Sequence, residues 1–207
     1  LKDCAGKLIV KDQTVTLQNV ITSVFGGQIG LNGMVSTKEK TPKFNMDLGL
    51  NKVDIAQTFT QLDMLKKIAP IAGAVSGKLN STIKLSGNLN ANEMTPDLKT
   101  ISGDLLGQLL STTVNSSNST LLSALDSNIK FIDLKKLNLN DLKAAVSFKD
   151  GKVTVKPFDI KYQDIKATIG GTHGFDQAMN YNIKFDVPAK YLGTEANALI
   201  AKLSPAD

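Results

Sequence analysis

The chain of 207 residues has no tryptophan and no arginine, only one cysteine and only one histidine. Aromatic residues make up 5% of it, so a core must be built mainly from Leu, Ile and Val, for which the 42% apolar content is ample. The single cysteine, Cys4, excludes an internal disulfide. No stretch approaches the roughly 20 apolar residues that a membrane-spanning helix needs.

The length bounds the domain organisation. A chain of 207 residues forms one large or two small domains, and we predict a single domain over residues 1–207. Because the chain starts without Met and enters a strand almost at once, we expect it to be a fragment of a longer protein. Any signal or membrane anchor would then lie upstream.

The motifs of the common enzyme classes are missing. A Ser-His-Asp hydrolase needs a histidine, and the only one, His173, lies in Gly-Gly-Thr-His-Gly, which is not a nucleophile elbow; we predict a turn residue. One Cys and one His cannot form a common zinc site, and no phosphate-binding loop is present. A pair of catalytic carboxylates stays open, although Asp and Glu fall mostly in turns and caps. We predict no enzyme activity, no metal and no cofactor.

The charge is basic but of one chemical kind. The net charge is +5, and all 24 basic residues are Lys, scattered through strands and turns. Arginine is the residue that makes bidentate contacts to phosphates and guanines, so we predict no nucleic-acid partner. A solvated polar face is the simplest interpretation, and a weak attraction to anionic lipid surfaces is the alternative.

Residues 143–187 show the alternation of a β-meander. Apolar and polar residues alternate on both sides of Asp150-Gly151, a pair that fits the tight turn of a hairpin. Two further alternating runs follow, at about 165–171 and 181–187. The segment therefore predicts four short strands with one apolar face.

The same pattern occurs near the N-terminus. A shift of 138 positions places Asp12 on Asp150 and Leu31 on Ile169, and a shift of 137 places Phe44 on Tyr181. Each run of strands is followed by helical spacing. The alignment predicts an internal repeat at about residues 7–72 and 145–203, against the alternative that short strands resemble each other by chance.

Two segments have the spacing of amphipathic helices. Asp54 can cap the first, with Gln57 in a capping box and an apolar stripe that runs to Pro70; the second follows Pro188. Strands are expected at 77–89 and 101–110, and glycines inside strands, such as Gly103, favour a bent sheet. We therefore predict a β-rich α+β fold: a curved, mostly antiparallel sheet with amphipathic helices on its concave face or ends.

Several short motifs follow one another in a particular order. They are Gly77–Leu89 (GKLNSTIKLSGNL), Met94-Thr95-Pro96, Ile101–Leu105 (ISGDL), Phe148–Val153 (FKDGKV), Ile169-Gly170-Gly171 and Val187–Gly193 (VPAKYLG). In this order they resemble the C-terminal region of the AsmA family of bacterial envelope proteins. The resemblance covers about residues 77–203, and the N-terminal third fits the family less sharply.

The resemblance implies a periplasmic domain of a protein anchored in the inner membrane. Relatives are implicated in outer-membrane biogenesis and in phospholipid movement between the membranes, and their elongated β-sheets form an apolar groove. The family brings no catalytic motif. The expected partners are a phospholipid or another acyl-chain lipid, with a membrane surface and envelope proteins as further candidates. A scaffold that assists outer-membrane protein assembly without bound lipid is the alternative function.

One face of the meander supplies the candidate lipid-binding residues. They are Val146, Phe148, Val153, Val155, Ile169, Ile183 and Phe185. Burying roughly ten methylenes at about 0.8 kcal/mol each would give a gross gain near 8 kcal/mol before ordering costs. The alternative for each of these residues is a place in the protein's own core.

Overall fold

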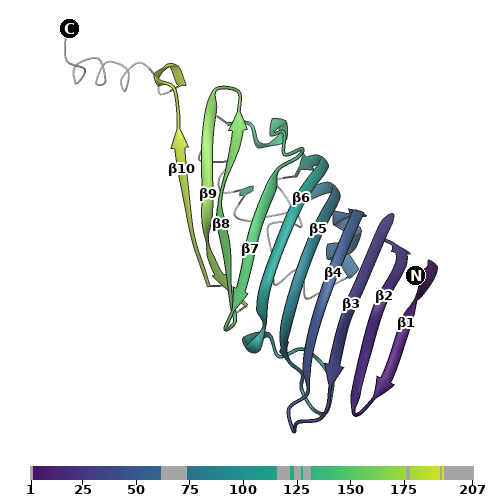
Figure 1. The fold of residues 1–207 in the computed structure, drawn as a ribbon. Helices are drawn as coiled ribbons and strands as arrows, with labels where there is room; N and C mark the ends of the chain where they lie inside the picture. Colours follow the sequence, from purple (N-terminus) through teal and green to yellow (C-terminus); the bar gives the residue numbers. More distant parts are fainter. Residues whose placement is uncertain are drawn as a thin grey trace.

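The computed structural model describes residues 2–61, 74–115, 122–123, 127, 132–175, 178–191 and 193. Ten strands form one antiparallel sheet in which every strand pairs with its neighbours in sequence, from β1 to β10 (Figure 1). The strands are β1 (Lys2–Lys11), β2 (Thr14–Val24), β3 (Gly27–Ser36), β4 (Lys43–Asp54), β5 (Val75–Asn88), β6 (Ser102–Val114), β7 (Lys143–Lys149), β8 (Lys152–Tyr162), β9 (Ile165–Gly174) and β10 (Met179–Asp186). β1 and β10 do not pair with each other, so the sheet is open.

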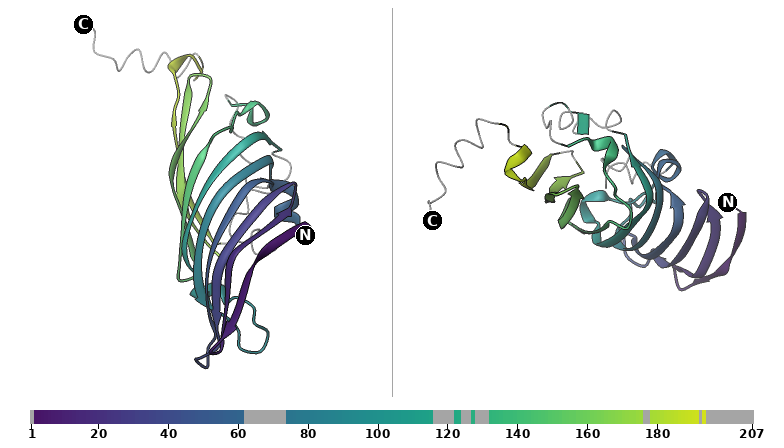
Figure 2. Two further views of the ribbon diagram at one scale, coloured as in Figure 1. Left: turned by 45° about the vertical axis from the view of Figure 1, so that its right-hand side comes forward. Right: turned by 90° about the horizontal axis from the view of Figure 1, so that it is seen from above.

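The predicted β-rich, curved antiparallel sheet is confirmed (Figure 2). The predicted packing of helices on the concave face is not supported by the described residues. The helix α1 (Ile55–Gln61) directly follows β4, and Ile55 and Phe59 join a cluster with Val75 and Val114, at the ends of β5 and β6. The helix therefore packs beside strand ends, because the chain leaves β4 there and returns through β5. Short 3₁₀ turns complete the fold: η2 (Leu98–Thr100), η4 (Leu134–Lys136) and η5 (Ala189–Tyr191).

The predicted cap of α1 is confirmed, but the capping box is incomplete. The Asp54 carboxylate accepts a hydrogen bond from the Gln57 amide at 2.8 Å. The Asp54 amide itself donates to the Phe25 carbonyl at 2.7 Å, so this donor already has a partner in the β2–β3 turn. The predicted continuation of this helix to Pro70 and most of the helix predicted after Pro188 lie outside the described residues.

The four strands predicted in residues 143–187 are confirmed as β7 to β10. Asp150 and Gly151 have φ angles of 51° and 74°, which is the geometry of a tight hairpin turn with two left-handed residues. In the β1–β2 turn, Asp12 and Gln13 have φ angles of 50° and 54°. Both meanders therefore begin with the same kind of turn.

The two meanders also share a β-bulge. The register between β2 and β3 shifts between Leu17 and Val20, and the register between β8 and β9 shifts between Val155 and Phe158. These positions coincide under the shift of 138 residues. A bulge is a local irregularity that alternation alone does not produce. The internal repeat itself stays a prediction, since β4–β5 and β5–β6 also contain register shifts.

The core lies on one face of the sheet and is divided into three clusters. The first contains Phe44, Leu50, Val53, Ile83, Leu85, Leu89, Ile101, Phe148 and Val153. The second contains Ile55, Phe59, Val75, Val114 and Leu139, and the third Ile132, Leu134 and Ile165. Segments that follow β5 and β6 supply Leu89, Ile101 and Ile132, so connecting loops as well as strands bury the apolar face.

A contact between the β8–β9 turn and η5 anchors the chain after β10. The Lys190 ammonium lies 2.5 Å from one oxygen of the Asp164 carboxylate, and the Tyr191 hydroxyl donates to the other at 2.6 Å. The Tyr191 hydroxyl also lies 2.9 Å from the side-chain oxygen of Gln163. The hydrogen bonds from Lys190 and then Tyr191 lower the pKa of Asp164. We call these three side chains, Asp164, Lys190 and Tyr191, the clasp.

Replacing Gly103 by Ala will destabilise the sheet. Gly103 has a φ of +149°, and a Cβ there would fall on the Lys84 carbonyl of the neighbouring strand. Backbone strain of this kind costs about 1–3 kcal/mol. Urea unfolding measures the loss. Gly49→Ala is the matched control, since a Cβ at Gly49 meets no atom within 4 Å. Equal stability of the two variants would contradict the geometry described for Gly103.

Asp164→Asn will change how stability depends on pH. A carboxyl whose pKa is lowered by folding stabilises the folded state fully above its ordinary value of 3.8 and loses that contribution as the pH falls below it. Urea midpoints of the two proteins should therefore differ at neutral pH and converge in acid. Because the clasp is exposed, the difference will be small and will shrink in high salt. Asp12→Asn, which removes one carboxylate from the β1–β2 turn and outside the clasp, is the matched control.

Candidate functional site: the apolar face of the sheet

The register places all seven candidate lipid-binding residues on one face of β7 to β10. Val146 lies opposite Val155, and Phe148 lies opposite Val153. Ile169 lies opposite Ile183. Phe185 lies on the same side, two residues further along β10. Alternation therefore gives the orientation of the whole set correctly.

Burial divides this set into core and accessible residues. Phe148 and Val153 are 2% and 0% exposed and belong to the first core cluster, against which Val146 packs. Phe185 packs against the third cluster. These four residues therefore lie in the protein's own core or pack against it.

Three candidate residues remain available on the face. Val155, Ile169 and Ile183 are half-buried, and none of them belongs to the three core clusters of the described residues. Phe158 lies directly opposite Ile169 and has the same half-buried state. We call these four residues the C-terminal apolar patch.

Sequence reasoning missed Phe158 because strict alternation fails in β8. The bulge after Val155 adds a residue, so Phe158 and not Pro157 continues the apolar face. A proline inside a strand is the signal that could have revealed it, because proline is confined to edges and bulges within sheets.

The first meander carries a second, more exposed apolar patch on the same face. Leu8 and Val10, on the edge strand β1, are 61% and 68% exposed. They lie opposite Leu17 and Val15 on β2, and β2 continues the face through Val20. The shift of 138 residues aligns Leu17 and Val20 with Val155 and Phe158. We call these five residues, Leu8, Val10, Val15, Leu17 and Val20, the N-terminal apolar patch. It was not predicted as a binding surface.

Two hollows in the described part of the chain lie on the opposite, convex face. One, of about 270 Å³, is lined by Met34, Ser36, Glu39, Thr41, Lys43, Phe44 and Asn45. The other, of about 290 Å³, is lined by Thr16, Leu17, Gln18, Asn32, Gly33, Met34 and Asn45. Leu17 of the N-terminal apolar patch also borders the second hollow, while no residue of the C-terminal apolar patch borders either one.

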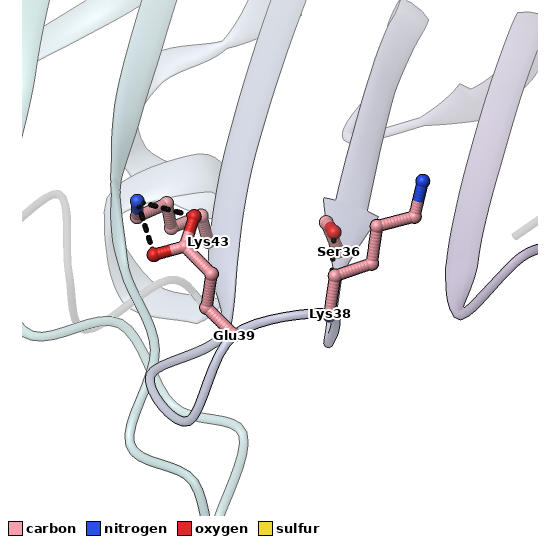
Figure 3. Close-up of polar contacts among 4 residues, drawn as sticks. All are labelled: Ser36, Lys38, Glu39 and Lys43. Carbon is pink, nitrogen blue, oxygen red and sulfur yellow. Dashed lines mark hydrogen bonds and ion pairs between the residues drawn. The ribbon is translucent and has the colours of Figure 1, made fainter.

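The first hollow is bordered by an exposed ion pair. The Lys43 ammonium lies 2.7 Å from both carboxylate oxygens of Glu39, while Lys38 points away from this pair (Figure 3). The side chains of Lys43 and Glu39 are 54% and 65% exposed, and such pairs contribute little to stability. The pair joins Glu39, in the β3–β4 connection, to the first residue of β4.

His173 lies inside β9, so the prediction of a turn residue is wrong. Its ring is 3% exposed, and its Nδ1 lies 2.9 Å from the hydroxyl of Tyr181 on β10. The two rings are stacked with their centres 6.1 Å apart, and burial raises the pKa of Tyr181. The geometry is that of a histidine hydrogen-bonded within the sheet. Alternation from Ile169 and Gly171 would have placed it on the apolar face.

Two further kinds of site are not found among the residues that the structure describes. No group of three His, Cys, Asp or Glu side chains in these ranges lies close enough to hold a metal ion. No helix in these ranges is long and apolar enough to cross a membrane. The two apolar patches are the candidate site because their side chains are exposed or half-buried on one face of the sheet.

The chain was compared with family models, curated proteins and solved structures. No family model, no curated protein and no solved structure matches the chain.

Proposed function

We propose that this chain is a non-catalytic, AsmA-like periplasmic domain that binds or transfers phospholipid between the inner and outer membranes. On this proposal it supports outer-membrane biogenesis and is held at the inner membrane by a segment outside the chain. The segment that contributes most to the resemblance, residues 77–89, forms β5 near the centre of the sheet. The order of the sequence motifs supports the family, and the apolar face supports the ligand.

One observation carries the proposal: the sheet is open and keeps accessible apolar side chains on one face. Leu8 and Val10 are more than half exposed, and Val155, Ile169 and Ile183 are half-buried. Soluble domains rarely leave contiguous apolar surface in water without a use for it. Covering such surface contributes about 25 cal/mol per Å², which is the driving force for holding an acyl chain.

The patches also indicate how lipid would be recognised. The C-terminal apolar patch offers no charged side chain, so contact would be made to the acyl chain. Of the neighbouring polar pair, His173 is buried and Tyr181 is half-buried, and the two side chains already contact each other at 2.9 Å. Recognition by tail contact predicts tolerance of different headgroups.

Ile169→Asp combined with Ile183→Asp will reduce phospholipid uptake at least tenfold. A carboxylate in the patch must be desolvated by any bound chain, at a cost of several kcal/mol. Uptake of a fluorescent phospholipid measures the change, and mass spectrometry of organic extracts measures lipid carried through native purification. The matched control is Thr16→Asp with Asn45→Asp, which adds the same charge on the other face of the sheet and outside β7 to β10.

The control variant should take up lipid like the unmodified chain, and circular dichroism should show that all proteins are folded. If the unmodified chain carries no lipid and takes up none, the proposal is wrong for this domain.

A scaffold for outer-membrane protein assembly is the second candidate. It is favoured by the open edge of β1, whose outward backbone groups can pair with an added strand next to the exposed Leu8 and Val10. In that case the lipid-free domain will suppress aggregation of an unfolded outer-membrane β-barrel protein, measured by light scattering. Val10→Pro, which blocks pairing at the edge, should abolish the suppression, whereas Ile169→Asp with Ile183→Asp, far from this edge, should leave it intact.

A further inference from the structure

The convex face of β7 to β10 carries a concentration of lysines. Because alternate residues point to opposite faces, the residues between the apolar ones point outward. Seven exposed lysines belong to these strands and face outward or lie at the bulge: Lys143, Lys149, Lys152, Lys156, Lys161, Lys166 and Lys184. The carboxylates on the same face are Asp159 and Asp186. We call this surface the basic face.

The basic face is not balanced by nearby acids. Lys166 pairs with Asp159 at 2.9 Å, and Asp164, in the bordering turn, is already bound by Lys190. Asp186 lies opposite Lys166 on the neighbouring strand. The described residues therefore leave most of these lysines without a counter-charge.

Like charges also stand directly opposite each other on this face. Lys149 pairs in register with Lys152, and Lys161 pairs with Lys166. Such pairs are destabilising, because two ammonium groups repel across adjacent strands. An arrangement that costs stability in the free protein is useful where a partner supplies the opposite charge.

The same face of the central strands is arranged differently. There Lys84 on β5 lies between Asp47 on β4 and Asp104 on β6, so each charge has an opposite neighbour. The unbalanced lysines of the second meander thus differ from the alternating charges of the central strands.

We propose that the basic face docks on a bilayer surface that contains anionic headgroups. Its lysines are spread over four adjacent strands, which span about 15 Å at roughly 4.8 Å per strand, and not gathered around a pocket. Lysine acts as a point charge without the directional fork of arginine, which suits a fluid layer of phosphates. The outward residues include no large apolar side chain on β9 or β10, so the contact is electrostatic and superficial.

This docking goes beyond the lipid-binding proposal, because it uses the opposite face of the same strands. It would hold the domain against a membrane while the apolar face remains accessible. Since attraction between lysines and an anionic leaflet decays within a Debye length, binding must depend strongly on salt.

Co-sedimentation of the 207-residue chain with vesicles tests the inference. One set contains phosphatidylcholine alone, and the other phosphatidylcholine with phosphatidylglycerol at about three to one. We expect binding to the anionic vesicles at about 0.01 M salt and its loss at about 1 M, where the Debye length falls from about 30 Å to 3 Å. Equal binding to both sets, or no binding to either, would overturn the inference.

Charge variants locate the contact. Each lysine near an anionic surface contributes about a fivefold factor in partitioning. The triple variant Lys152→Gln, Lys161→Gln and Lys184→Gln should therefore bind about a hundredfold more weakly. The matched control, Lys7→Gln, Lys11→Gln and Lys84→Gln, removes the same charge from strands β1 and β5. It should bind within about threefold of the unmodified chain. Equal weakening of both triples would show a general charge effect and would overturn the docking face.

Two further measurements separate bilayer docking from lipid uptake by the apolar face and from nucleic-acid binding by the basic face. The Ile169→Asp and Ile183→Asp variant should keep its binding to anionic vesicles even if lipid uptake is lost, so the two proposals can fail independently. Single-stranded RNA is the competing polyanion. If it binds while anionic vesicles bind no better than neutral ones, the basic face is a nucleic-acid surface and the bilayer proposal is wrong.

Discussion

The fold depends on keeping one parity of side chains on one face through ten successive strands. In a sheet whose strands pair only with sequence neighbours, a slip of one residue in any strand would turn its apolar set to the solvent. The chain keeps the parity even where the ladder is irregular. At the bulges after Leu17 and Val155 the extra residue is accommodated, and Val20 and Phe158 return to the apolar side. Bulges also increase local twist, which suits a curved sheet.

The open sheet leaves the apolar face unevenly covered. The centre is buried by α1 and by the loops that carry Leu89 and Ile101, whereas the two lateral regions keep accessible side chains. The accessible positions are related by the same shift that relates the two meanders. If the domain arose from two copies of one unit, each copy would have brought one apolar patch.

The two faces of the second meander differ sharply in chemistry. One presents Val155, Ile169 and Ile183, and the other presents unbalanced lysines such as Lys161 and Lys184. A phospholipid has two parts, a headgroup and acyl chains. The lysine face suits anionic headgroups, and the apolar face suits acyl chains. Their placement on opposite sides of one thin sheet makes the two contacts separable by substitution.

The sequence alone determined the strands, the Asp150-Gly151 hairpin, the cap at Asp54 and the orientation of the seven candidate residues. These features depend on local turn geometry and on the two-residue period of strands, and both are set by residues that are adjacent in the sequence. Only the tertiary structure decided which apolar residues are covered. Phe148 is core because Leu89 and Ile101, from a loop distant in sequence, belong to the same cluster, whereas Ile169 belongs to none of the clusters of the described residues. Likewise the burial of His173 depends on the next strand, which supplies the Tyr181 hydroxyl 2.9 Å from its Nδ1. Burial depends on packing between residues that are distant in sequence, so a local sequence pattern cannot predict it.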